Sequence, residues 1–191
     1  MRWVCGGRMK RLTLAIAGLV YSLWERLEGA VLADRMRHTK ERFATCGKNI
    51  SIRSDVVVHG PEHVSVGNDI SIGEGSRIMA YGGLTIGDNV IISRDVTIYC
   101  SDHSFGGDNP LPFGEGRNPR PVTIGDNCWI GAHVRILPGS SIGEGAIIGM
   151  GAIVAGEVPP CAIIGQPKFR LLGERSHDEY NRAKLRNSSE P

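Results

Sequence analysis

Aliphatic residues recur every six positions along most of this chain, and this repeat constrains the fold more than any other feature. Of fifteen positions at this spacing, eleven are Ile, three are Val and one is Cys. The spacing excludes an amphipathic helix, whose apolar residues recur at three and four, and a plain strand, whose period is two. The positions are Cys46, Ile52, Val58, Val66, Ile72, Ile78, Ile86, Ile92, Ile98, Ile124, Ile130, Ile136, Ile142, Ile148 and Val154.

Six residues fit a short strand followed by a tight turn, and three such units return the chain to its starting direction. The repeat therefore predicts a three-sided prism of about five coils, with about 18 residues per coil and the aliphatic residues inside. A glycine directly follows eight of these residues, and we expect it to supply backbone freedom at the bend. Small residues four positions further on, such as Ser76, Val96 and Ala146, are expected to share the interior.

The repeat is interrupted once, between Ile98 and Ile124. From Ile86 to Ile124 is 38 residues, which equals one coil of about 18 and an excursion of about 20. The excursion, residues 104–123, is rich in Gly, Pro and Asn, so we expect an extended loop without regular structure. Position 102, where the interior would require a small apolar residue, is Asp102, and His103 follows it. A charged pair that breaks a packing pattern indicates a functional site.

The repeat also carries a family resemblance, most specific in "PVTIGDNCWIGAHVRILPGSSIGEGAIIGMGAIVAGEVPP" followed by "GQPKFRLL". From Cys46 to Leu172 the chain resembles the hexapeptide-repeat acyltransferases, in the branch of maltose, galactoside and polysaccharide O-acetyltransferases. The resemblance implies a mainly β fold, a left-handed parallel β-helix with an N-terminal α-helix and an inserted loop. The expected organisation is a helical segment (1–44), the β-helix domain (45–171) with loop 104–123, and a polar C-terminal tail (172–191).

The activity implied by the resemblance is transfer of an acetyl group from acetyl-CoA to a hydroxyl of a sugar or glycan. The hydroxyl must lose its proton as it attacks the thioester, and imidazole, with a reference pKa near ~6.5, suits a general base at neutral pH. The histidine that does this work in the resembling enzymes aligns with His103. Its orienting partner is either the adjacent Asp102 or a backbone carbonyl.

Further site residues follow from the same resemblance. The indole of Trp129 would line the groove for the pantetheine arm of acetyl-CoA, and the backbone N–H of Ala132 would stabilise the developing oxyanion. The remaining donor contacts implied are Met150 and Ala155 at the pantetheine, and Lys168 and Arg170 at the nucleotide phosphates. The resembling enzymes usually carry a Lys where this chain has Gly156-Glu157. We therefore expect the contacts to the nucleotide phosphates to be weaker or to come from other residues.

The acceptor side departs from the family pattern. Sugar acetyltransferases of this branch often carry Asn or Asp one coil before the base, whereas this chain reads "RIMAYGGL" there. Tyr81 is the polar candidate for acceptor binding in that segment, together with Asp102 beside the base. We therefore expect an acceptor other than simple maltose or a galactoside.

The N-terminal segment contains an apolar run, Leu12 to Trp24, after Arg8, Lys10 and Arg11. The run has 13 residues, whereas a membrane-spanning helix needs about 20. The pattern favours a helix packed on its own protein; the alternatives are an amphipathic helix at a membrane surface and a signal peptide. We expect a cytoplasmic protein, with a possible site of action at the inner face of the membrane.

Other classes of function are disfavoured by the composition. The 22 basic and 20 acidic residues leave a net charge of +2, which argues against a nucleic-acid-binding protein. The five cysteines show no zinc-ligand spacing, and we expect Cys46, Cys128 and Cys161 to be reduced and mostly buried. No two of the six histidines have the five-residue spacing of the related zinc enzymes, the γ-class carbonic anhydrases, so no metal site is expected.

Two alternatives to O-acetylation stay open: N-acylation of an amino sugar, and a non-catalytic β-helix scaffold. The resemblance also implies a homotrimer, because a single prism is too open to exclude water from a thioester. In such a trimer His103 of one subunit would face Trp129 or the coil edge of another.

Overall fold

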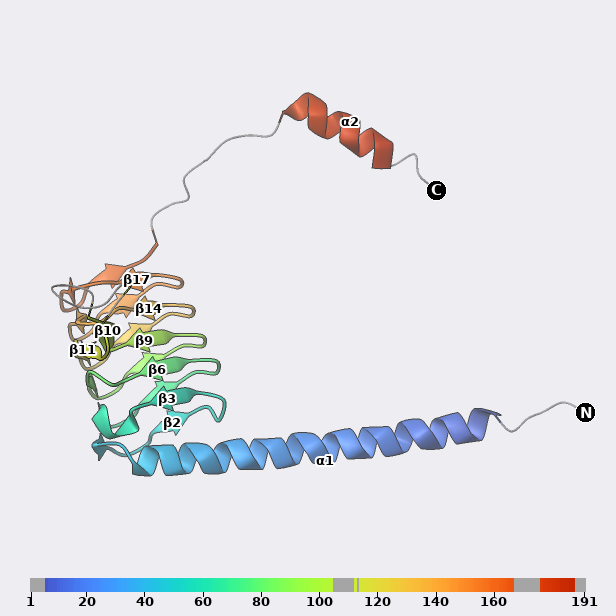
Figure 1. Cartoon of the computed structure of the whole chain (residues 1–191), viewed down its shortest axis with the longest axis horizontal. Helices are drawn as coiled ribbons and strands as arrows, with labels where there is room; N and C mark the ends of the chain where they lie inside the picture. The colour runs from blue at the N-terminus through green and yellow to red at the C-terminus, as the bar shows by residue number, and fades with distance from the viewer. Residues whose placement is uncertain (1–5, 105–111, 113, 167–175, 188–191) are drawn as a thin grey trace, which may run out of the picture.

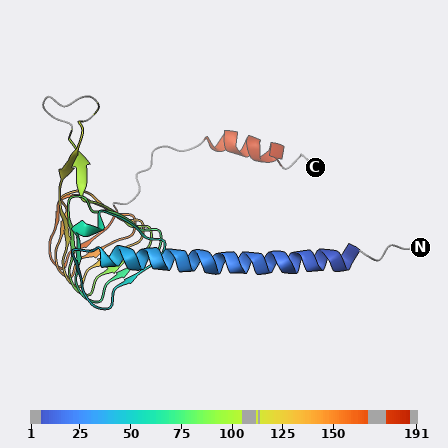
Figure 2. The same cartoon turned by 60° about the horizontal axis from the view of Figure 1, so that its bottom comes forward.

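The computed structural model describes residues 6–104, 112, 114–166 and 176–187, and its centre is a three-sided prism of parallel strands. Figure 1 shows the coils stacked on one another, and Figure 2 shows their triangular outline. Face 1 contains β1 (Thr45–Cys46), β4 (Val64–Val66), β7 (Leu84–Ile86), β12 (Val122–Ile124), β15 (Ser141–Ile142) and β18 (Glu157–Val158). Face 2 contains β2 (Ser51–Ile52), β5 (Ser71–Ile72), β8 (Ile91–Ile92), β13 (Trp129–Ile130), β16 (Ile147–Ile148) and β19 (Ile163–Ile164). Face 3 contains β3 (Val57–His59), β6 (Arg77–Met79), β9 (Thr97–Tyr99), β14 (Arg135–Ile136) and β17 (Ile153–Val154).

The repeating aliphatic residues form the interior of this prism, as the sequence predicts. Ile86 pairs in register with Ile124 across the interruption, so the excursion leaves the stacking of the coils intact. The side chains of Ile98, Ile130 and Ile136 are fully buried. The eight small residues expected to share the interior are buried too: Ser76, Val90, Val96, Cys128, Val134, Ser140, Ala146 and Ala152.

The prism is one partial coil longer than the fifteen aliphatic positions indicate. Faces 1 and 2 each have six strands, because β18 and β19 continue the stack beyond Val154. Val158 follows Val154 after four residues instead of six, and this shortened corner hides the last coil from a strict six-residue count. Val158 is nevertheless buried, and it pairs in register with Ile142.

The glycines that follow the aliphatic residues have a different role from the one predicted. None of these eight has a positive φ; at the corner after face 1, that conformation belongs to residues such as Asn49 and Asn127, two positions later. At Gly67 a Cβ atom would lie 2.8 Å from the carbonyl oxygen of Gly87 in the next coil. Glycine is therefore required here because successive coils approach closely, and the prediction of backbone freedom at this position is wrong.

Helix α1 (Gly6–Glu41) extends away from the prism across the end of its first coil (Figure 1). Near its C-terminal end Met36, and just after it Phe43, are buried in the core. Further towards the N-terminus the large apolar side chains of this helix are exposed, with Leu19 at 63% and Trp24 at 64%. The favoured prediction, a helix packed on its own protein, is therefore wrong for most of its length. No helix in the described part of the chain is long and apolar enough to cross a membrane.

Two further differences concern the ends of the chain. The polar tail contains a second helix, α2 (His177–Asn187). Cys46 and Cys161 are exposed, so the prediction that they are buried is wrong. Cys46 lies in β1, at the end of face 1, and Cys161 lies in a turn near the other end of the stack. Cys128 is buried as predicted.

Candidate active site

The excursion leaves the prism at the corner between faces 3 and 1 and projects from it as a hairpin (Figure 2). Its base is an antiparallel ribbon of β10 (Ser101–His103) and β11 (Arg117–Pro119), with His103 opposite Arg117. The expected loop without regular structure is thus wrong at its base. The chain departs at Ser101, three residues earlier than predicted, and rejoins face 1 at Val122.

Cys100 explains where the hairpin begins. This residue is fully buried, whereas Asp102, at the position expected to lie inside, is exposed. Cys100 stacks on the preceding coil, where its N–H donates to the carbonyl of Met79 (3.0 Å). Burial raises the pKa of the Cys100 thiol to about 11, so this thiol stays protonated and uncharged at neutral pH. Cys100 is therefore the last residue of this coil that packs in the interior, and the ribbon begins with the next residue.

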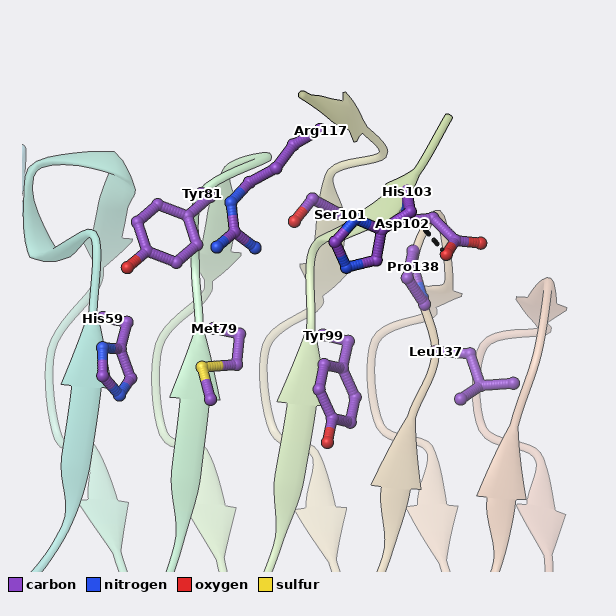
Figure 3. Close-up of a pocket in the computed structure, with 10 residues that line it drawn as sticks. All are labelled: His59, Met79, Tyr81, Tyr99, Ser101, Asp102, His103, Arg117, Leu137 and Pro138. Carbon is purple, nitrogen blue, oxygen red and sulfur yellow. Dashed lines mark hydrogen bonds between the residues drawn. The ribbon is translucent and has the colours of Figure 1, made fainter. Parts of the chain in front are cut away.

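The ribbon fixes the backbone at the candidate base. The carboxylate of Asp102 accepts a hydrogen bond from the backbone N–H of His103 at 2.8 Å (Figure 3). At the root of the ribbon the N–H of Arg120 donates to the carbonyl of Cys100 (2.9 Å). The imidazole of His103 is exposed on the single chain. Asp102 therefore fixes the peptide of His103 through this hydrogen bond.

His103 lies in a pocket between the hairpin and the outer side of face 3 (Figure 3). The pocket has a volume of about 550 Å³, which suits a small-molecule ligand. Tyr81, predicted for acceptor binding, lines it together with Asp102 and His103. Three of the predicted residues are thus brought together around one cavity.

Sequence reasoning missed other residues of this pocket. His59 and Tyr99 stand on the ends of face 3 strands, and Arg117 reaches in from the ribbon. The six-residue repeat contained a signal for the first two, because each directly follows an interior residue by one position and so points outward. Arg117 lies within the excursion, where the six-residue repeat is absent, and only the strand pairing of the ribbon brings it opposite His103.

The residues predicted to bind the donor lie at a second edge of the prism. Trp129 projects from face 2, where its indole N–H donates to the Ser93 hydroxyl (3.4 Å) and 53% of its surface is exposed. Ala132 and Met150 occupy the corner between faces 2 and 3 in consecutive coils, and the Ala132 carbonyl accepts from the N–H of Gly151 (2.8 Å). Among the described residues no acceptor faces the N–H of Ala132, so this donor is available.

The other residues predicted to bind acetyl-CoA do not lie at this edge in the described structure. Ala155 is exposed and follows face 3, at the edge that carries the hairpin. Lys168 and Arg170 lie outside the described residues. Within the described part of the chain, no three His, Cys, Asp or Glu side chains are grouped so that they could hold a metal ion.

The predicted base and most of the predicted donor-binding residues therefore lie at two different edges of one chain. The hairpin edge, defined by Tyr81, His103 and Arg117, offers an imidazole and a pocket. The tryptophan edge, defined by Trp129, Ala132 and Met150, offers an exposed indole and a backbone donor. Face 3 lies between these two edges of the same chain.

Comparison with known proteins identifies the family. The family model for bacterial transferase hexapeptide (six repeats) matches residues 121–156. The galactoside O-acetyltransferase of Escherichia coli (strain K12) is 31% identical over 166 residues, which cover 78% of this chain and 79% of the relative. This chain belongs to the hexapeptide-repeat acetyltransferases. A putative acetyltransferase of Staphylococcus aureus (strain MRSA252) is 32% identical over 160 residues, 75% of this chain and 77% of the relative.

Solved structures of this family share the fold. A maltose O-acetyltransferase from Clostridium difficile 630 matches with a TM-score of 0.62 and 27% identity, over 75% of each chain. An acetyltransferase from Vibrio cholerae, complexed with acetyl coenzyme A, has a TM-score of 0.62 and 24% identity, over 74% of this chain and 76% of its own. The predicted family, the mainly β parallel β-helix and the class of enzyme, an acyltransferase, are thus confirmed.

Proposed function

We propose that this acetyltransferase moves the acetyl group of acetyl-CoA to a hydroxyl of a sugar or glycan. The observation that carries the proposal is the pocket that holds His103 beside aromatic and polar side chains. An imidazole at the wall of a pocket can reach a hydroxyl bound there, and base catalysis of this kind contributes roughly 10²–10⁴-fold. The galactoside and maltose acetyltransferases among its relatives support a sugar as the acceptor.

In the proposed reaction His103 removes the hydroxyl proton while the hydroxyl oxygen attacks the carbonyl carbon of the thioester. The N–H of Ala132 donates to the oxyanion that develops on that carbonyl. The carbon–sulfur bond then breaks, an O-acetyl ester is formed, and the proton passes from the imidazolium to the departing thiolate of coenzyme A. The indole of Trp129, with Met150, packs against the pantetheine arm, while Ala155 contacts it from its own edge.

We propose further that the working enzyme is a homotrimer. In a ring with threefold symmetry each contact joins two different surfaces of the protomer. The hairpin edge and the tryptophan edge are two such surfaces, and face 3 between them would then face the ring's axis. In this arrangement His103 of one subunit meets the Ala132 of the next, which supplies both halves of the site and excludes water from the thioester.

A cytoplasmic location fits the cysteines. All four described cysteines are free thiols, and two of them, Cys46 and Cys161, are exposed. Exposed unpaired thiols are typical of a reducing compartment, where acetyl-CoA would be the donor.

The proposal is tested by the His103→Ala variant. Release of coenzyme A in the presence of a sugar acceptor should fall at least a hundredfold, while the circular dichroism spectrum stays unchanged. The matched control is His177→Ala, since His177 lies in α2, outside the pocket. Near-normal turnover by His103→Ala would remove His103 from the reaction. Acetylation of amino sugars at nitrogen, with hydroxyl acceptors unchanged, would favour the N-acyltransferase alternative.

A further inference from the structure

The pocket beside His103 contains a cation, Arg117, for which the described part of the chain provides no acidic partner. Arg117 lies on β11 opposite His103, and its guanidinium carbon lies 4.1 Å from the centroid of the Tyr81 ring. None of the ion pairs among the described residues includes Arg117. A guanidinium that is stacked on an aromatic face keeps its N–H groups at its edge, where they can bind a planar anion.

The aromatic stack holds this guanidinium in place. The Tyr81 ring has the imidazole of His59 at a centroid distance of 6.3 Å, with the two planes tilted by 34°. Figure 3 shows the guanidinium between the Tyr81 ring and Ser101, directed towards the cavity. A cation over an aromatic ring gains roughly 0.5–1 kcal/mol at an exposed site, so the stack favours this orientation of Arg117 before a ligand arrives.

Among the described residues, the carboxylate that lines the cavity forms no ion pair with this cation. Asp102 is the one carboxylate among the described lining residues, and it already accepts from the backbone N–H of His103. His59 and His103 add two imidazoles. Two further arginines, Arg77 and Arg135, are exposed on the same face of the prism, on β6 and β14.

We propose that the acceptor is an anionic sugar, whose carboxylate or phosphate is bound by Arg117 and whose ring packs against the aromatic side chains of Tyr81 and Tyr99. The proposal rests on the proposed function, because it concerns the acceptor of the same site. An acceptor of this kind would distinguish the enzyme from acetyltransferases that act on neutral sugars. A charge-assisted pair with a guanidinium is worth enough to favour the anionic sugar about tenfold or more in affinity.

The test is a binding measurement, so that it does not depend on turnover. Glucuronate, glucose 6-phosphate and glucose are titrated into the full-length protein, and ligand-detected NMR gives the three affinities. We expect one or both anionic sugars to bind at least tenfold more tightly than glucose, and the Arg117→Gln variant to lose this preference. The control Arg53→Gln removes an exposed charge outside the pocket and should keep it.

Which anionic sugar is preferred distinguishes a carboxylate from a phosphate. Equal affinities for the three sugars, binding of none of them, or an undiminished preference in Arg117→Gln would overturn the proposal. The proposed function fails separately, because it requires loss of turnover in His103→Ala whatever the charge of the acceptor.

A second inference comes independently from helix α1. Its exposed apolar side chains recur at helical spacing and therefore share one side of the helix. This apolar stripe consists of Ile16, Leu19, Val20, Leu23, Trp24, Leu27 and Val31, each between 54% and 64% exposed. Glu25, by contrast, falls on the other side of the helix at 100° per residue, and Glu28 borders the stripe. A stripe of this size on a helix that extends away from the prism indicates a surface that is covered in the working protein.

The charges of the segment decide between the possible occupants. Residues 1–24 contain Arg2, Arg8, Lys10 and Arg11 and no acidic residue. The first acidic residue is Glu25. Two copies of this segment would repel each other when aligned side by side, whereas an anionic lipid surface attracts the basic residues and accepts the apolar stripe. Tryptophan and tyrosine, present here as Trp24 and Tyr21, are enriched at the headgroup level of membranes.

We infer that α1 lies in the surface of an anionic membrane and holds the enzyme there. The helix runs across the end of the prism instead of along its stacking direction (Figure 1). In a trimer of parallel prisms, the three helices would consequently lie at the same end of the assembly and bind one membrane together. Such multivalent binding is stronger than that of one helix.

The test uses the full-length protein and sedimentation with lipid vesicles. We expect binding to vesicles that contain phosphatidylglycerol, at least tenfold weaker binding to phosphatidylcholine alone, and a similar tenfold loss in the Leu19→Gln/Leu23→Gln variant. The control Glu25→Gln changes the opposite side of the helix and should keep the binding to phosphatidylglycerol vesicles. Circular dichroism confirms that each variant keeps its helix.

Equal binding to both kinds of vesicle would overturn the role of the basic residues, and binding to neither would overturn the inference. The protein could instead fail to bind vesicles while its molecular mass in solution rises with protein concentration. If that rise requires an intact apolar stripe, the stripe is an interface between copies of the chain.

Discussion

Ile130 in the prism and Leu23 in helix α1 are both aliphatic, yet Ile130 is fully buried whereas Leu23 has 60% of its surface exposed. The prism buries its aliphatic residues against the same chain, coil on coil. Helix α1 has an apolar stripe that no described residue of the chain covers. Apolar sequence therefore serves internal packing in one region and, as we infer, binding to a membrane in the other.

The largest expected difference between the two regions is in stability. Ile130→Ala leaves a cavity in a close-packed column and should lower the free energy of unfolding by about 2–5 kcal/mol. Leu23→Ala removes an exposed side chain and should change it by less than about 0.5 kcal/mol. Urea unfolding of both variants, at one protein concentration and without lipid, checks the pair. A large loss in Leu23→Ala would mean that α1 packs on the protein in solution.

A matched pair of glycines should give effects of opposite sign. At Gly82 a Cβ would lie 1.6 Å from the carbonyl oxygen of Cys100, at the root of the hairpin. Gly82→Ala should cost about 1–3 kcal/mol, since the backbone must shift, and should also reduce turnover. Gly18, in α1, has open space around its Cβ position, so Gly18→Ala should stabilise the helix by up to about 1 kcal/mol. Thermal unfolding distinguishes the two, and a tolerated Gly82→Ala would contradict the close contact between coils.

A smaller effect concerns the pH dependence of stability. Burial raises the pKa of the Cys100 thiol from 9.0 to about 11. The folded state thus holds this proton longer than the unfolded state does, so the contribution is present below pH 9.0 and is lost as the pH rises through about 11. Between these values wild type should lose more thermal stability than Cys100→Ala. Parallel curves for the two proteins would show that Cys100 does not titrate in this way.

The interior of the prism could be predicted from the sequence because each of its positions has one requirement, a small or aliphatic side chain at a fixed spacing. Val158 shows the limit of this reasoning, since a shortened corner moved it out of the count. Cys100 shows another, because it fills the interior position that a strict repeat assigned to residue 102.

The candidate site was predicted only in part, because its residues depend on contacts that no spacing encodes. His103 stood out by breaking the repeat, but Arg117 reaches the pocket through strand pairing across a segment of irregular length. The repeat did indicate that Trp129 lies on a different face from the strand that precedes His103. Trp129 directly precedes Ile130, an interior residue of face 2. His103 comes after β9, a strand of face 3.

The division of the site between two chains is the central claim, and subunit complementation tests it most directly. His103→Ala and Trp129→Glu, each inactive alone, are unfolded together in equal amounts and refolded as mixed trimers. If each site takes the hairpin edge of one chain and the tryptophan edge of its neighbour, about a quarter of the sites contain both intact halves, and a corresponding share of wild-type activity returns. If the mixed trimers stay inactive although they have formed, both halves act within one chain and the claim is wrong.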